Sequence, residues 1–105
     1  MAAPVYTTGS WKPFPGQEEL FVEAWGEFMG WATGMPGAGE AVLARDLRDP
    51  ERFVSVAEWE SMEAVRAWKG SPEFKERMGR VQQYVDKFAP TELEVVAGPV
   101  SGHAS

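Results

Sequence analysis

The sequence predicts a single α+β domain in which one antiparallel sheet carries two helices on one face. The chain has 105 residues, which is enough for one hydrophobic core but short of the length at which a second becomes common. Segments with a two-residue apolar period alternate with segments of helical period. Their order is strand, helix, strand, strand, helix, strand, and a Ser-Pro break divides the second helix.

The first strand is expected over residues 5–11, which are rich in β-forming residues. Gly9 inside it marks either a bulge or a point where another group, such as a ligand, approaches the backbone closely. A helix is expected over residues 17–33, because apolar residues recur there at steps of one, three and four. These residues are Leu20, Phe21, Ala24, Trp25, Phe28, Met29 and Ala32.

Residues 40–47 and 53–59 predict two strands joined by a polar turn, and therefore an antiparallel hairpin. The second strand is apolar on both faces, with Val54 and Val56 on one face and Phe53, Ala57 and Trp59 on the other. We expect the second set to lie on the open face of the sheet. Because so apolar a surface is unstable in water, a second copy of the chain is expected to cover it, giving a homodimer.

The second helix is expected to begin after Ser61, which stands at an N-cap position. It breaks at Gly70-Ser71-Pro72, resumes, and is predicted to end at Pro90. The apolar stripe of this later part consists of Phe74, Met78, Val81, Val85 and Phe88. A last strand is predicted over residues 91–100, followed by a disordered tail at 101–105. The whole order is that of a ferredoxin-like βαββαβ domain spanning residues 1–105, with its core in residues 4–100.

The composition of the chain argues against several classes of function. A formal net charge of −6 argues against nucleic-acid and anionic-membrane partners. The absence of cysteine excludes disulfides, thiolate metal sites and cysteine nucleophiles, and it fits a reducing compartment. The N-terminal residues lack the features of a secretory signal, and no segment is long and apolar enough to span a bilayer, so we expect a cytoplasmic protein.

The chemical inventory is sparse. The single histidine, His103, lies in the tail, and no phosphate loop, serine elbow or nucleotide fingerprint is present, so neither metal nor cofactor is expected. The carboxylate pairs Glu58/Glu60 and Glu92/Glu94 could serve acid–base chemistry or bind a cation, but we favour a solvated edge for both. Five tryptophans could wall a pocket for a flat aromatic molecule or simply fill the core. They are Trp11, Trp25, Trp31, Trp59 and Trp68.

One stretch resembles a known family. The run FVSVAEWES at 53–61, a following helix with an Ala-Trp pair, and the Ser-Pro-Glu-Phe segment at 71–74 resemble the antibiotic biosynthesis monooxygenase domain, and the element order matches over residues 4–100. The resemblance implies a dimeric α+β barrel with a pocket between helices and sheet. Members of this family include oxygenases that act on aromatic polyketides without metal or flavin, and relatives that bind and degrade haem.

Carried over residue by residue, the polyketide-oxidising pattern matches at Trp59, but Ser55 stands where that branch has Asn and Val65 where it has Tyr. The haem-degrading pattern matches at Trp68, but Gly9 replaces its Asn and Met78 its ligating His. Haem degradation by that mechanism is therefore not expected.

The resemblance and the residues lead to one hypothesis with two alternatives. The hypothesis is a monooxygenase without metal or flavin that acts on a planar aromatic or phenolic molecule. Its catalytic residues would be Ser55 and Trp59, and its substrate-binding residues Trp68, Trp25, Phe28, Gly9 and Met78. The alternatives are a non-catalytic dimeric barrel that binds a hydrophobic metabolite, and a haem-binding relative that lacks the haem-degrading residues.

Overall fold

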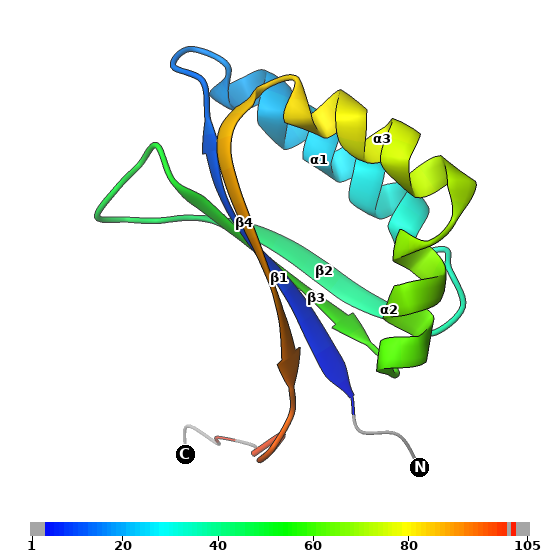
Figure 1. Ribbon diagram of the computed structural model, residues 1–105. Helices are drawn as coiled ribbons and strands as arrows, with labels where there is room; N and C mark the ends of the chain where they lie inside the picture. The colour runs from blue at the N-terminus through cyan, green and yellow to red at the C-terminus, as the bar shows by residue number, and fades with distance from the viewer. Residues whose placement is uncertain (1–3, 101, 103–105) are drawn as a thin grey trace.

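The computed structural model describes residues 4–100 and 102. In this part of the chain, four strands form one antiparallel sheet in the order β2-β3-β1-β4, and three helices cover one of its faces (Figure 1). The elements are β1 (Val5–Pro13), α1 (Glu18–Ala32), β2 (Ala38–Arg45), β3 (Phe53–Trp59), α2 (Met62–Lys69), α3 (Pro72–Gln82) and β4 (Val85–Glu94). The predicted ferredoxin-like class is confirmed. Of the predicted tail, all but Gly102 lies outside the described residues, His103 included.

The hairpin of β2 and β3 forms as predicted, with Val42 paired to Val56. Its turn is held by Asp46, whose carboxylate accepts hydrogen bonds from the backbone N–H of Arg48 at 2.8 Å and from the Arg52 guanidinium at 2.9 Å. The backbone N–H of Arg48, and then the bond from Arg52, hold the pKa of Asp46 below its usual range. The lowered pKa of Asp46 is therefore a consequence of the hydrogen bonds that hold this turn.

The two faces of β3 are the reverse of the prediction. Phe53, Ala57 and Trp59 are buried beneath the helices, whereas Val54 and Val56 point to the open side. The alternation could not choose between two apolar faces. The larger aromatic side chains take the covered face because they remove more apolar surface from water there.

The second helix is divided as predicted, into α2 and α3. Ser61 caps α2 by accepting a hydrogen bond from the backbone N–H of Ala64 at 3.2 Å. Ser71 makes no such cap for α3. Its hydroxyl instead donates to the carbonyl of Trp68 at 2.8 Å, which fixes the end of α2 against the start of α3.

The predicted end of the last helix was wrong. Helix α3 stops at Gln82, and Val85 and Phe88 belong to β4, which begins six residues earlier than expected. The spacing of Val85 and Phe88 fits a helical stripe, but Phe88 is a strand residue stacked on Trp11. Pro90 does not end a helix but lies in β4, where it pairs in register with Gly9 of β1. Because β4 is an edge strand, one of its sides needs no hydrogen bonds, and proline is tolerated there.

Candidate functional site

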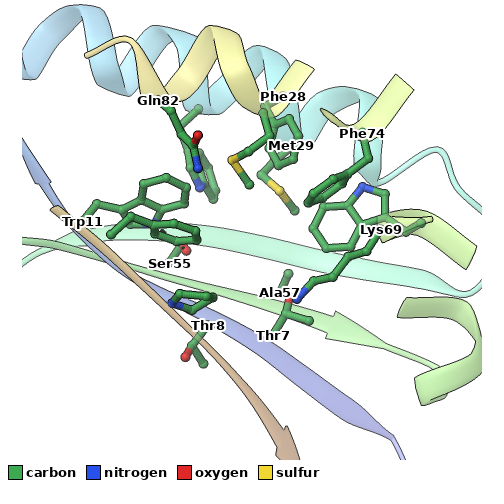
Figure 2. A pocket seen from close by; sticks show the side chains of 15 residues that line it. Thr7, Thr8, Trp11, Phe28, Met29, Ser55, Ala57, Lys69, Phe74 and Gln82 are labelled. Atoms are coloured by element: carbon green, nitrogen blue, oxygen red, sulfur yellow. Dashed lines mark hydrogen bonds between the residues drawn. The ribbon is translucent and has the colours of Figure 1, made fainter. Parts of the chain in front are cut away.

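A cavity of about 220 Å³ lies between the helices and the covered face of the sheet (Figure 2). All six elements other than β2 contribute side chains or backbone to its wall. The lining residues are Thr7, Thr8, Trp11, Trp25, Phe28, Met29, Ser55, Ala57, Trp68, Lys69, Phe74, Met78, Gln82, Phe88 and Pro90. Thr8 is an open-face residue whose side chain points away from the cavity in Figure 2.

Aromatic rings form two opposed parts of the wall. On the side of α2 and α3, Trp68 and Phe74 meet at 88° with ring centroids 5.0 Å apart, and Phe28 packs against both. On the side of β4, Trp11 and Phe88 are stacked with centroids 4.0 Å apart. Such rings offer flat, apolar faces to a ligand, and the stacking fixes the orientation of each ring.

Ser55 is a buried polar residue in this wall. Its hydroxyl oxygen accepts a hydrogen bond from Trp11 Nε1 at 2.9 Å, and the residue is buried. Since one serine hydroxyl can accept and donate at once, its own proton stays available for another acceptor. The bond therefore orients a hydroxyl donor at the cavity.

Gly9 explains how the Trp11 indole reaches Ser55. The strand pairing runs without a bulge through Gly9, which lies directly opposite Ser55. A Cβ at this position would stand 2.6 Å from Trp11 Nε1 and 2.9 Å from Ser55 Oγ, both shorter than any real contact. The close approach expected at Gly9 is thus made by the indole of Trp11, and glycine is the residue that leaves room for it.

A second indole bonds to a second hydroxyl on the same two strands. Trp59 Nε1 donates to Thr7 Oγ1 at 3.2 Å, and the Trp59 ring is stacked on Trp68 with centroids 4.6 Å apart. Trp59 is only 1% exposed and does not line the cavity. It lies behind the wall and supports the ring of Trp68.

Trp68 itself carries an unusual polar atom. Among the described residues, its Nε1 is the buried side-chain nitrogen or oxygen that finds no hydrogen-bond partner. The ring is held by Trp59 on one side and by Phe28 and Phe74 on others.

The one charged residue that lines the cavity in the described part of the chain is Lys69, the last residue of α2. Its Nζ donates to Glu92 Oε2 on β4 at 2.8 Å, and about a third of its side chain is exposed. In Figure 2 the Lys69 side chain extends from its helix toward Thr7 and Ala57. The ammonium therefore lies at the rim, between α2 and the sheet.

The structure brings together five of the seven residues proposed from sequence. Ser55, Trp68, Trp25, Phe28 and Met78 all line one cavity, whereas Trp59 and Gly9 lie against residues that line it. Sequence reasoning did not assign Lys69, Gln82 or Phe88 to the site. Phe88 was hidden by the helix predicted across β4, and Lys69 could have been noticed only as the neighbour of Trp68.

Two further observations bear on cofactors and membranes. Within residues 4–100 and 102, no three His, Cys, Asp or Glu side chains are grouped so that they could hold a metal ion. Over the same residues, each helix is too short or too polar to cross a bilayer.

A sequence model of one protein family, antibiotic biosynthesis monooxygenase, matches residues 4–80, which is most of the chain. The chain belongs to this family. The match ends before β4, so Phe88, Pro90 and Glu92 lie beyond it. A search of curated protein sequences gives no match.

Solved structures show the same fold as this family member. SnoaB, a cofactor-independent oxygenase from Streptomyces nogalater, is 15% identical with a TM-score of 0.83, over 95% of this chain and 100% of that one. Rv0793 from Mycobacterium tuberculosis is 16% identical with a TM-score of 0.80, over 93% and 100%. A conserved protein from Methanosarcina mazei Go1 is 15% identical with a TM-score of 0.79, over 88% and 92%.

Proposed function

We propose that this family member is a monooxygenase that needs neither metal nor flavin and acts on a planar phenolic or quinone-forming molecule bound in the cavity. The observation that carries the proposal is an aromatic-walled cavity with an oriented hydroxyl, that of Ser55, in its wall. At about 220 Å³ the cavity is below the roughly 300–1,000 Å³ of sites for drug-sized ligands, which favours a compact ligand of two or three rings over a macrocycle.

The chemistry requires little of the protein. An acidic ring CH₂ group that has lost a proton to the solvent before binding is an electron-rich anion, which can reduce O₂ itself. Two C–H bonds break, one oxygen atom becomes a ring carbonyl, and the other leaves as water. The carbon supplies all four electrons that O₂ takes up, so no further reductant is needed. The protein must bind the anion, stabilise its oxygen and exclude water.

Named side chains fit these tasks. The Ser55 hydroxyl would donate to the developing oxyanion, and the faces of Trp68, Trp25 and Phe28 would hold the planar rings. Met78, a flexible and polarisable side chain, would fill the space around the ligand. Trp59 and Gly9 would act through Trp68 and Trp11, whose positions they determine.

Two measurements test this function in sequence. Quenching of tryptophan fluorescence by anthrones, naphthoquinones and hemin, corrected for their absorption, tests whether the cavity binds a ligand. Oxygen uptake with the bound class then tests catalysis, and saturable uptake that depends on both protein and substrate is expected. Binding without uptake would support the alternative of a non-catalytic metabolite-binding barrel. Saturable quenching by hemin alone would instead favour the haem-binding alternative.

We propose in addition that a second copy of the chain covers the open face of the sheet. On this face Val42, Val56 and Leu93 are 57%, 37% and 47% exposed, and Val42 and Val56 are direct cross-strand neighbours. The solution mass, measured by light scattering after gel filtration, is expected to be that of a dimer. Val42→Glu with Val56→Glu should give a monomer, and a monomeric wild-type chain would disprove this proposal.

A cytoplasmic location remains part of the proposal, supported by the cysteine-free sequence. Cell fractionation would test it.

A further inference from the structure

We infer that Lys69 binds the acidic oxygen of the ligand, so that the cavity selects ionised phenols and enols over neutral quinones of the same shape. This inference rests on the function proposed above and names the substrate class more closely. The site is an apolar cavity with one cation at its rim. Lys69 was not among the residues proposed from sequence.

The charge distribution favours an anion at this point. Apart from Lys69, the side chains that line the cavity in the described part of the chain are apolar or neutral. The chain as a whole carries a formal net charge of −6, so an anion approaching at random is repelled. The Lys69 ammonium is the one positive group on the cavity wall in the described residues, and the Glu92 carboxylate 2.8 Å away offsets part of its charge.

Lys69 also has hydrogen-bonding capacity to spare. An ammonium carries three donors, and the structure uses one of them, in the bond to Glu92 at 2.8 Å. Glu92 lies opposite Thr7 in the pairing of β4 with β1, and Thr7 lines the cavity. The bond to Glu92 thus leaves two donors of the ammonium for a ligand oxygen. Glu92 does not line the cavity itself.

The ion pair has a plain structural explanation, in which Lys69 only ties α2 to β4. The two explanations differ in what the two halves of the pair should do. If the pair is structural, Lys69→Met and Glu92→Gln should have the same effect. If Lys69 binds the anion, only Lys69→Met should weaken anion binding, and Glu92→Gln should leave it equal or stronger because a nearby negative charge is removed.

The test uses two probes of nearly the same shape, 2-hydroxy-1,4-naphthoquinone, which is ionised at neutral pH, and 2-methoxy-1,4-naphthoquinone, which has no acidic group. Dissociation constants come from tryptophan quenching on the full chain. In the wild type the hydroxy probe is expected to bind about tenfold more tightly than the methoxy probe, the size of one charge-assisted hydrogen bond. Lys69→Met should abolish that preference with little change for the methoxy probe. Lys75→Met, a change to an exposed lysine on α3, serves as the control and should preserve it.

The outcomes separate the two proposals. Equal binding of both probes by the wild type, or a preference that survives Lys69→Met, overturns the role of Lys69 and leaves the proposed function standing. Binding of neither probe contradicts both. A second readout is the visible absorption of a weakly acidic hydroxyquinone, whose bound pKa should fall in the wild type and not in Lys69→Met. A merely structural ion pair would not shift it.

Discussion

The two tryptophan–hydroxyl hydrogen bonds between β1 and β3 are alike in construction and differ in place. In each, the indole N–H of a tryptophan on one strand donates to a hydroxyl on the other strand. The hydroxyl belongs to the residue that pairs with the position two residues before the tryptophan. Each indole is also stacked on one further ring, Trp11 on Phe88 and Trp59 on Trp68. Yet Trp11 lines the cavity, whereas Trp59 lies behind it.

The two arrangements differ in the residue two positions before each tryptophan. The position two before Trp11 is Gly9, and the equivalent position before Trp59 is Ala57. Without a Cβ at Gly9 the Trp11 indole lies across the strand and its bond is 2.9 Å long, whereas the bond of Trp59 is 3.2 Å long. The same motif therefore serves packing at one end of the strand pair and shapes a cavity at the other.

The largest loss of stability is expected at Trp59, the tryptophan that lies behind the cavity. Trp59→Ala should lower the free energy of unfolding by about 3–5 kcal/mol, because a fully buried indole and its stacking contact with Trp68 are lost. Urea unfolding followed by circular dichroism measures this without relying on tryptophan emission. Trp31→Ala, at a partly buried residue outside the cavity, is the control and should cost less. Equal losses would mean that Trp59 has no special structural role.

Gly9→Ala tests the other arrangement, the hydrogen bond between Trp11 and Ser55. The added methyl group would overlap Trp11 Nε1 and Ser55 Oγ, so the indole must move, at a cost near the upper end of about 1–3 kcal/mol. Binding of planar ligands should weaken with it. Gly26→Ala is the matched control, since a Cβ there meets no atom within 4 Å, and in a helix interior it should stabilise the chain by about 0.5–1 kcal/mol. Unimpaired stability and binding in Gly9→Ala would refute this explanation of Gly9.

Removing the two acceptors separately sharpens the comparison. Ser55→Ala and Thr7→Val each leave a buried indole N–H without its partner, and each should cost about 1–2 kcal/mol. Only Ser55→Ala is expected to lower turnover in the oxygen-uptake assay, because Ser55 is the proposed donor to the substrate. Adding Trp11→Phe to Ser55→Ala removes the unpaired N–H but also part of a buried ring, and it should restore none of the turnover. Full turnover in Ser55→Ala would remove Ser55 from the mechanism.

The smallest effect is expected at Asp46, which takes part in neither bond. Because its pKa is lowered in the folded chain, Asp46 contributes stability above the pKa of the unfolded state, about 4, and that contribution is lost as pH falls through the folded pKa. Asp46→Asn should therefore flatten the loss of stability between pH 5 and pH 3, measured by urea unfolding, and should leave ligand binding unchanged. A pH profile identical to that of the wild type would contradict the assignment.

The sequence allowed the order of elements to be predicted, because apolar period and caps are local signals. It did not determine which face of β3 is covered, since Val54 and Val56 are as apolar as their neighbours and only packing against the helices decides. The helix predicted through Val85 and Phe88 failed for a related reason. A spacing of three or four residues fits a helix, but pairing with β1 overrides it.

The candidate site was predictable where a residue type carries its own signal. Tryptophans near a strand and a helix break indicated an aromatic wall, and Ser55 came from its place in the family pattern. Lys69 and Glu92 carry no such signal, because 23 residues separate them and only the fold brings them together. The role of Gly9 in leaving room for an indole could not be predicted from sequence either, since it depends on the path of the Trp11 side chain.

The sheet order has a consequence for synthesis of the chain. The first strand, β1, is central, and it pairs with both β3 and the last strand, β4. The ring that stacks on Trp11 and the carboxylate that holds Lys69 both lie on β4. A nascent chain that has emerged only as far as α3 can build the hairpin and cover it with helices, but it still lacks one wall of the cavity. Binding competence should therefore arise only after β4 has left the ribosome and has closed the long-range pairing with β1.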